Sequence, residues 1–238
     1  MNPKQTRRWH EFPDRTGLEQ SALRFILESA EQAIAERGTF KLALAGGHTP
    51  FGIYQALCNA ETDWSAWQVY FGDERCLPAE NPRRNSRMAR AAWLDHVPIP
   101  PAQIHTIPAE LGPEEAARRY ARELAEVGEF DLVLLGLGED GHTVSLFPGG
   151  AWEQATSWPV AIPVFAAPKP PSQRVSLSPA RLSQARRVLF LVGGDGKQQA
   201  LTAWRNGAPI PASRICPPAG VDVFLHLCGH LATPSGKP

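Results

Sequence analysis

Four short apolar runs, separated by stretches of helical periodicity, constrain the fold of this 238-residue chain more than any other feature. The runs are Leu42–Ala45, Val69–Phe71, Leu132–Leu135 and Val188–Val192. Short, continuously apolar runs are typical of strands buried on both faces of a parallel sheet. Leu18–Arg37 and Pro113–Val127 instead repeat apolar residues at helical spacing. The alternation predicts an α/β fold: a largely parallel, doubly wound, Rossmann-like sheet with helices on both faces.

Glycine and proline indicate where these elements end. Gly38 follows the first helical stretch, where a C-cap favours the left-handed conformation, and Pro50 suits the first turn of another helix. The proline-rich stretch Pro159–Pro171 is expected to be a surface excursion rather than a linker, because the alternation resumes after it. Residues 1–238 are therefore expected to form a single domain.

The charge balance excludes general attraction to nucleic acid or anionic membranes. Lys plus Arg and Asp plus Glu both total 24, so an anionic ligand must be held by locally gathered cations.

No apolar run approaches the roughly 20 residues that a spanning helix needs, and Met1–Phe12 does not resemble a secretory signal. The four cysteines are scattered and are interpreted as reduced thiols. A cytoplasmic protein is expected, and its oligomeric state is left open.

Glycines and polar side chains follow each of the four apolar runs. The turns are Gly46–Pro50, Gly72–Arg75, Gly136–Thr143 and Gly193–Lys197. The carboxyl ends of parallel strands share one edge of the sheet, and ligands bind in the crevice there. A single such turn needs no functional explanation, because glycine commonly marks strand-to-helix connections. Four turns that each combine glycine with charged, hydroxyl or imidazole groups predict a shared site.

Three of these turns carry groups suited to a phosphate. Glycine lets backbone N–H groups approach an anion closely, and a following helix N-terminus adds a favourable dipole. The residues expected to cradle the phosphate are Gly46, Gly47, His48 and Thr49. Arg75 and Lys197 would supply the positive charge that a phosphate dianion needs in a neutral protein. Arg174 is either a third phosphate-binding cation or a solvated charge at a strand end.

His142 is the predicted general base. An imidazole has an unperturbed pKa near ~6.5, and a neighbouring carboxylate fixes its tautomer and raises its basicity. Asp140, two residues away, and Asp73, in another strand-end turn, are the carboxylates counted with His142 as catalytic candidates. The sequence leaves open which carboxylate orients the imidazole. The plainer alternative is a packed or exposed histidine with no chemical role.

The sequence motifs of several other enzyme classes are incomplete or absent in this chain. Gly136–Gly141 matches G-x-G-x-x-G, but Pro148 would break the helix that a dinucleotide site requires. Gly196-Lys197 lacks the rest of a P-loop, and no G-x-S-x-G esterase motif occurs. His226 and His230 lack the glutamate of a zinc-binding helix and are interpreted as structural or surface histidines. No cofactor or metal is expected.

At the strand-end turns the chain resembles the bacterial-type 6-phosphogluconolactonases, relatives of the glucosamine-6-phosphate isomerases. The family pattern L-G-x-G-x-D-G-H-T-A-S-L-F-P matches Leu135–Pro148, with Val144 in place of alanine. Its S-G-G-S-T-P matches Ala45–Pro50 with His48 for serine, and its D-E-R matches Asp73–Arg75 with an asparagine segment near Asn85. Arg174 and Lys197 stand where the family keeps basic residues.

The resemblance implies hydrolysis of 6-phosphoglucono-δ-lactone to 6-phosphogluconate in the oxidative pentose phosphate pathway, with a sugar phosphate as the small-molecule partner. It implies that His142 deprotonates the attacking water and that neither metal nor organic cofactor takes part. One alternative is the related sugar-phosphate isomerase/deaminase, which carries a glutamate where this chain has Leu146-Phe147-Pro148. Another is a non-catalytic sugar-phosphate sensor, but only Lys4, Arg7 and Arg8 precede the domain, too little for a DNA-reading module.

Overall fold

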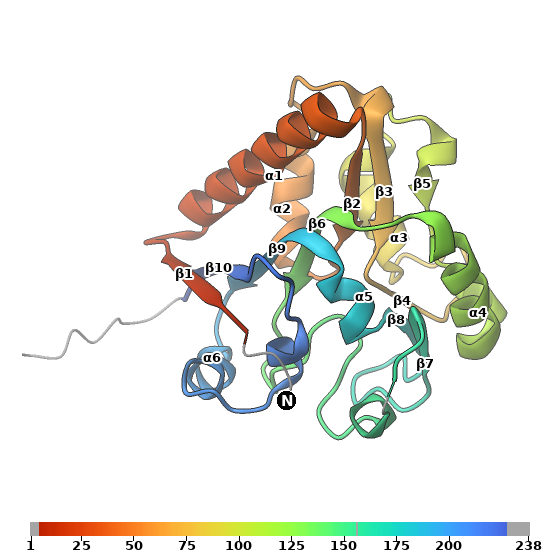
Figure 1. The fold of residues 1–238 in the computed structure, drawn as a ribbon, viewed down its shortest axis with the longest axis vertical. Helices are drawn as coiled ribbons and strands as arrows, with labels where there is room; N and C mark the ends of the chain where they lie inside the picture. Colours follow the sequence, from red (N-terminus) through yellow and green to blue (C-terminus); the bar gives the residue numbers. More distant parts are fainter. Residues whose placement is uncertain (1–4, 156, 228–238) are drawn as a thin grey trace, which may run out of the picture.

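The computed structural model describes residues 5–155 and 157–227, and its main feature is a seven-stranded sheet in which every neighbouring pair is parallel. From left to right in Figure 1 the strands are β1 (Arg7–Glu11), β10 (Val221–His226), β9 (Ala185–Gly193), β6 (Phe130–Gly136), β2 (Phe40–Leu44), β3 (Trp67–Phe71) and β5 (Ile104–His105). The four strands predicted from apolar runs are β2, β3, β6 and β9, and all four are confirmed.

The helices lie between the strands, as the sequence predicts. They are α1 (Arg15–Arg37), α2 (Thr49–Leu57), α3 (Asn85–Ala89), α4 (Pro113–Glu123), α5 (Pro179–Ser183) and α6 (Gln198–Arg205). A π-helical turn, Arg90–Leu94, continues α3, and short 3-10 turns occur at Trp64–Ala66, Pro101–Gln103, Ala109–Leu111, Leu124–Glu126, Ala151–Gln154 and Pro211–Arg214. The Asp14 side chain caps α1, which ends at Gly38 in the left-handed conformation with φ 70°.

Aromatic contacts show that helices cover both faces of the sheet. Val223 of β10 is paired with Phe190 of β9, so these two side chains share a face, and Phe224 points to the other. Trp204 of α6 packs on Phe190, with ring centroids 4.7 Å apart. Phe25 of α1 packs on Phe224 at 5.5 Å. α6 and α1 therefore cover opposite faces, which confirms the predicted doubly wound fold.

The chain reverses its direction of travel across the sheet between β2 and β6. From β2 it proceeds outward to β3 and β5, whereas from β6 it proceeds the other way to β9 and β10. The connections that leave β2 and β6 therefore diverge and open a crevice at the carboxyl ends of these two strands. The glycine turns at Gly46 and Gly138 leave the sheet at this point.

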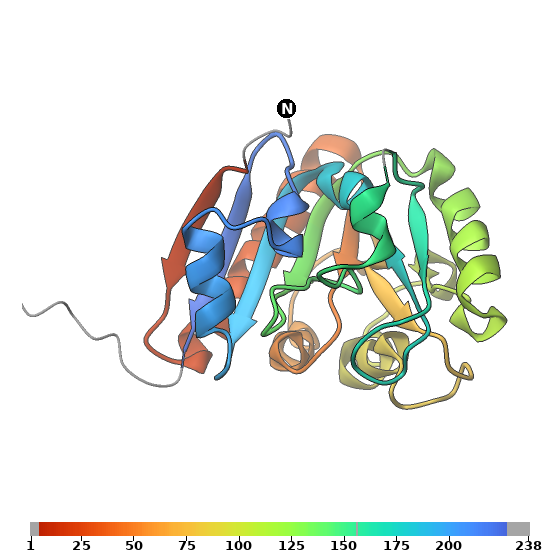
Figure 2. The ribbon, with the colours of Figure 1, turned by 90° about the horizontal axis from the view of Figure 1, so that it is seen from below.

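A second, three-stranded antiparallel sheet, which the sequence did not reveal, lies beside the main one. It consists of β4 (Asp73–Arg75), β8 (Arg174–Leu177) and β7 (Ala161–Val164), and α4 lies against it (Figure 2). The expectation that Pro159–Pro171 is a surface excursion rather than a linker missed β7, which lies within this stretch and pairs with β8. β4 follows β3 after Gly72 alone, so this sheet begins at the edge of the crevice.

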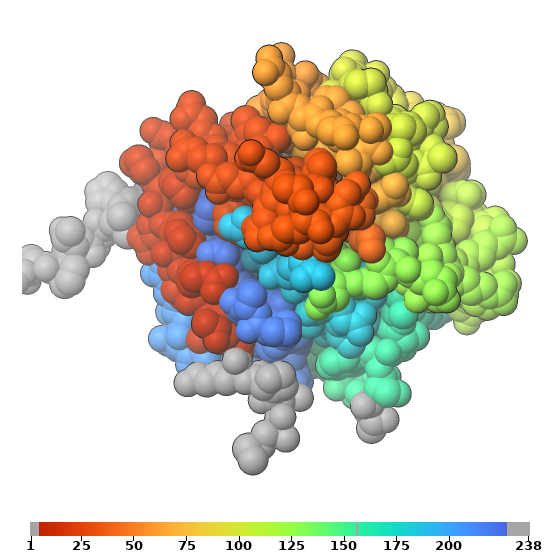
Figure 3. Space-filling model, turned by 45° about the horizontal axis from the view of Figure 1, so that its top comes forward, coloured from red at the N-terminus to blue at the C-terminus, as the bar shows by residue number. Residues whose placement is uncertain are grey.

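The two ends of the described chain meet at one edge of the main sheet. β1 pairs with β10, and the red N-terminal segment lies against the blue C-terminal segment in the space-filling view (Figure 3). Buried apolar residues of both sheets and of their helices belong to one hydrophobic cluster. Among the described residues, no helix is long and apolar enough to cross a membrane. The extent of the domain over residues 1–238 stays a prediction, since 228–238 lie outside the described residues.

Candidate active site

A cavity of about 490 Å³ opens at the carboxyl ends of the strands, where β2 and β6 diverge. All four predicted turns contribute residues to its wall. The predicted site residues that line it are Gly46, Gly47, His48, Thr49, Asp73, Arg75, His142, Arg174 and Lys197. Asp140 does not line the cavity and instead lies behind His142, to which it is hydrogen bonded.

The turn after β6 brings His142 and Asp140 together. Nδ1 of His142 lies 2.5 Å from Oδ1 of Asp140, and the His142 backbone N–H donates to the same oxygen at 3.1 Å. The Gly138 N–H closes the turn on the His142 carbonyl at 2.7 Å. A Cβ atom at Gly138 would overlap the imidazole, so only glycine fits there. The geometry thus selects Asp140 as the carboxylate that orients His142.

The Asp140 contact leaves the second imidazole nitrogen of His142 available to the cavity. When Nδ1 carries the proton that Asp140 accepts, Nε2 presents a lone pair. The ring packs on Phe147, with centroids 4.6 Å apart, and its side chain is only 20% exposed. Burial opposes ionisation of Asp140, but hydrogen bonds from His142 outweigh it and hold the pKa of the carboxyl below its ordinary value. An anionic Asp140 favours this tautomer.

Asp73, the other candidate carboxylate, is bound to different partners. Its Oδ1 accepts from Nδ2 of Asn85 at 2.9 Å, and its Oδ2 accepts from Oγ of Ser145 at 2.5 Å. It is buried in the cavity wall and has no hydrogen bond with His142. Asp73 therefore connects β4, the start of α3 and the turn after β6.

Arg75 and Arg174 lie directly opposite each other in the small sheet, so their side chains share a face. Each lines the cavity, and in residues 5–155 and 157–227 neither forms an ion pair with a carboxylate. Arg174 is buried and donates to the carbonyls of Lys169 at 2.7 Å and Pro171 at 3.1 Å, so its interpretation as a solvated charge is wrong. Burial lowers its pKa, and the charge of Arg75 lowers it further against the attraction of Asp73.

The turn after β2 supplies backbone N–H groups at the start of α2. The first N–H groups of a helix have no partner within it, and α2 begins at Thr49, beside the cavity. Gly47 adopts φ 96°, a conformation that favours glycine. At Gly46 a Cβ atom would overlap the side-chain amide of Asn85. The exposed His48 side chain makes no capping hydrogen bond.

Comparison with known proteins shows the family of this chain. A family model described as glucosamine-6-phosphate isomerases/6-phosphogluconolactonase matches residues 13–224. The chain belongs to this family. A 6-phosphogluconolactonase of a Synechocystis species is 42% identical over 193 residues, which cover 77% of this chain and 79% of the relative. One from Mycobacterium leprae is 33% identical over 230 residues, covering 91% and 93%. The crystal structure of 6-phosphogluconolactonase from Thermotoga maritima matches with a TM-score of 0.85 and 26% identity, over 92% of this chain and 99% of that one.

Several side chains that were not predicted as site residues also line the cavity of this family member, among them Lys169 and Asn85. Lys169 lies in the proline-rich loop, 3.9 Å from Oε2 of Glu139. Its only sequence signal was a basic residue shortly before Arg174. Asn85 had appeared in the family resemblance without a role. Burial lowers the pKa of Lys197, although the nearby Glu139 opposes that shift.

The described residues contain no group of three or more histidine, cysteine, aspartate or glutamate side chains that could hold a metal ion. His226 ends β10, whereas Cys228 and His230 lie outside the described residues. The interpretation of the His226/His230 pair as structural or surface histidines therefore stays a prediction.

Proposed function

We propose that this chain hydrolyses 6-phosphoglucono-δ-lactone to 6-phosphogluconate, the lactone hydrolysis of the oxidative pentose phosphate pathway. The observation that carries the proposal is the placement of an oriented base and unpaired cations on one cavity. His142, held by Asp140, and the two arginines Arg75 and Arg174 all face the same space. The relatives named 6-phosphogluconolactonase, at 33% and 42% identity, support it.

The reaction uses the free nitrogen of His142. Nε2 accepts a proton from a water molecule, whose oxygen attacks the lactone carbonyl carbon. The anionic Asp140 stabilises the resulting imidazolium. When the tetrahedral intermediate collapses, the bond from carbon to the ring oxygen breaks and the imidazolium returns its proton to that oxygen. The carboxylic acid product then ionises, so each turnover releases one proton. Backbone N–H groups of the glycine turns are suited to stabilise the oxyanion.

The phosphate is bound away from the reacting carbon. Arg75, Arg174 and Lys197 supply positive charge, and the N–H groups of Gly46 to Thr49 supply hydrogen bonds at the start of α2. Because the phosphate takes no part in the chemistry, its binding energy serves to orient the carbonyl toward His142. A sugar phosphate is therefore the expected partner.

The hydrogen bonds of Asp73 argue against the isomerase reaction of the same family. In that reaction a carboxylate could carry the proton between sugar carbons, but both carboxylate oxygens of Asp73 accept hydrogen bonds, from Asn85 and Ser145. The glutamate of the isomerase pattern is also missing after Phe147. Lactone hydrolysis, in contrast, needs only one base and one water molecule.

The test is a proton-release assay on freshly prepared 6-phosphogluconolactone, run beside an ammonia-release assay on glucosamine 6-phosphate. We expect proton release well above the spontaneous rate and no ammonia. Ammonia release without lactone hydrolysis would replace the proposal by the deaminase reaction, and activity on neither compound would favour the non-catalytic sensor. A cytoplasmic location and the absence of a nucleic-acid partner stay predictions.

A further inference from the structure

Glu74 lies between two residues of the cavity wall but does not reach the cavity itself. Side chains alternate along β4, so Asp73 and Arg75 line the cavity, while Glu74 points the other way and is 0% exposed. A completely buried carboxylate is costly unless hydrogen bonds and counter-charge compensate it. Its partners therefore indicate why the charge is kept.

Three backbone N–H groups donate to the Glu74 carboxylate. Oε1 accepts from the N–H of Arg75 at 2.8 Å and of Asn85 at 2.7 Å, and Oε2 accepts from the N–H of Ser86 at 2.8 Å. Two of these donors are the first residues of α3, so the carboxylate also compensates the unpaired N–H groups of that helix. Glu74 thus fixes the main chain of β4 to the start of α3.

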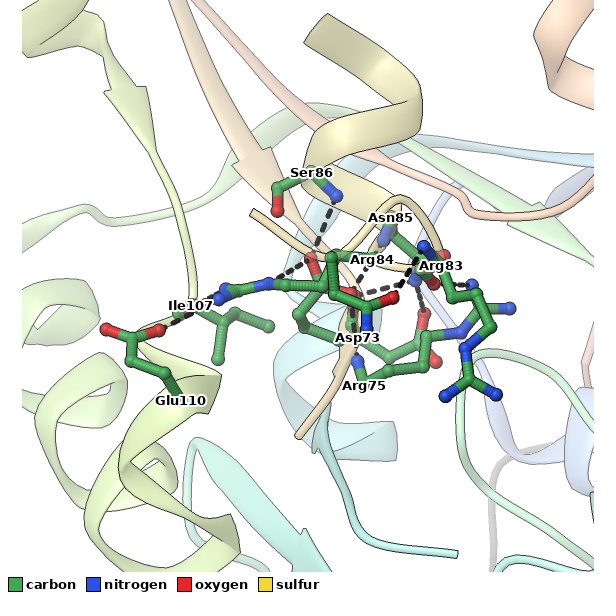
Figure 4. Close-up of polar contacts among 10 residues, drawn as sticks. Asp73, Arg75, Arg83, Arg84, Asn85, Ser86, Ile107 and Glu110 are labelled. Carbon is green, nitrogen blue, oxygen red and sulfur yellow. Dashed lines mark hydrogen bonds and ion pairs between the residues drawn. The ribbon is translucent and has the colours of Figure 1, made fainter. Parts of the chain in front are cut away.

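Arg84 balances the buried charge from the other side. Its Nε lies 3.4 Å from Oε2 of Glu74, and its guanidinium continues to Oε2 of Glu110 at 2.8 Å and the carbonyl of Ile107 at 2.6 Å (Figure 4). The side chain of Glu110 is 40% exposed. Of the two carboxylates that contact Arg84, only that of Glu74 is therefore fully buried. The network ties the wall of the cavity to the connection after β5.

The side chains that this network holds line the cavity. Nδ2 of Asn85 donates to both the carbonyl and Oδ1 of Asp73, at 3.0 and 2.9 Å. Arg75, whose own N–H is fixed by Glu74, extends its guanidinium to the carbonyl of Arg83 at 2.6 Å (Figure 4). The position of the Arg75 charge and of the Asn85 amide therefore depends on one buried carboxylate.

We propose that Glu74 is a positioning residue for substrate binding: it holds Arg75 and Asn85 at the geometry that the phosphorylated substrate requires, without touching the substrate. The proposal rests on the proposed lactonase function and on the phosphate-binding role of Arg75. A displacement of about 1 Å in a binding group is enough to lower activity by up to about 100-fold. Loss of the carboxylate should therefore affect binding of the phosphate more than the chemistry at His142.

The test compares Glu74→Gln with the matched control Glu110→Gln, which removes the other carboxylate on Arg84 but leaves the three N–H contacts in place. For Glu74→Gln we expect KM for 6-phosphogluconolactone to rise between about tenfold and about 100-fold, with a much smaller change in kcat. Activity on unphosphorylated glucono-δ-lactone should change little. Glu110→Gln should keep the KM of the wild type.

Glu74→Asp serves if the glutamine variant does not fold, because it keeps the charge and moves it by one methylene. It should still raise KM for the phosphorylated lactone. An unchanged KM in a folded Glu74 variant would overturn the proposal. So would an equal loss of activity on both lactones in step with lost folded protein, since that result indicates a purely structural role. Absence of lactonase activity in the wild type would instead refute the proposed function.

Discussion

In two strand pairs an arginine lies directly across from another charged residue. In one pair the two charges attract each other, and in the other they repel. In the pair of β1 with β10, Arg8 faces Asp222, and Nε and Nη2 of Arg8 donate to its two carboxylate oxygens at 2.9 and 2.8 Å. His10 adds a third contact to Asp222 at 2.9 Å. In the pair of β4 with β8, Arg75 faces Arg174, and no carboxylate of the described chain pairs with either.

We interpret the difference as one between charges that serve folding and charges that are available to a ligand. Opposite charges across a strand pair stabilise it, whereas like charges directly opposite each other destabilise it. The Arg8–Asp222 pair is complete within the protein and lies away from the cavity. The Arg75–Arg174 pair lines the cavity and lacks an anion. A phosphate bound there would complete the second pair as Asp222 completes the first.

Of the substitutions in the two strand pairs, removal of one charge from the Arg75–Arg174 pair should have the largest effect, and that effect should be on substrate binding. Arg75→Met should weaken binding of the phosphorylated lactone by about 2 to 3 kcal/mol, or roughly 30- to 150-fold in KM. Unfolding by urea should show equal or greater stability, because the repulsion with Arg174 is relieved. Unphosphorylated lactone is the control substrate. An unchanged KM, or a marked loss of stability, would mean that Arg75 serves the fold.

The balanced pair should show the reverse pattern. Asp222→Asn should lower the free energy of unfolding by about 1 to 2 kcal/mol, a modest value because Arg8 is nearly half exposed and solvent screens the pair. KM should stay as in the wild type. Asp95→Asn, in an exposed ion pair with Arg90, is the control and should change stability by less than about 0.5 kcal/mol. A raised KM in Asp222→Asn would contradict the interpretation that the Arg8–Asp222 pair serves folding alone.

The stabilisation that Asp222 gives to the folded protein should be lost in acid. Burial opposes its ionisation, but Arg8 and then His10 outweigh burial and lower the pKa of Asp222 in the folded protein. Because the folded pKa lies below the unfolded one, the stabilisation is complete above about pH 4 and is lost as pH falls through the folded pKa. Urea titrations should therefore show the wild type and Asp222→Asn converging in strong acid. If the free energies of unfolding of the wild type and Asp222→Asn differed by the same amount at every pH, the ion-pair explanation would be contradicted.

A smaller effect is expected from Lys197. Burial lowers its pKa below the ordinary lysine value, so it loses its charge earlier than an exposed lysine as pH rises. The affinity for 6-phosphogluconate, measured by calorimetry between about pH 7 and about pH 10, should decline toward the alkaline end. Lys197→Arg should remove most of that decline, because a guanidinium stays protonated. The same decline in both proteins would exclude Lys197 as its source.

The strand-end turns could be predicted because their signals are local. A short apolar run followed by glycine and charged residues predicted the ends of β2, β3, β6 and β9, and these turns meet at one cavity. The chirality and parallel pairing of such sheets then determine which ends share an edge.

The small sheet could not be predicted, because its strands carry weak local signals. β4 has three residues, and β7 lies in a proline-rich stretch whose pairing depends on the distant Arg174–Leu177. Without that sheet, the sequence could not place Arg75 opposite Arg174 or bring Lys169 to the cavity. Val144, with φ 46°, is another feature that no propensity predicts, since β-branched residues rarely adopt a positive φ.

In the proposed reaction, the cations of the cavity bind the substrate while His142, oriented by Asp140, converts it. The most direct measurement compares wild type and His142→Ala in kcat for 6-phosphogluconolactone, corrected for spontaneous hydrolysis, and in the dissociation constant of 6-phosphogluconate. For His142→Ala we expect a fall in kcat of about 100-fold to 10,000-fold, with product affinity within about threefold of the wild type. A kcat near that of the wild type in His142→Ala would contradict it.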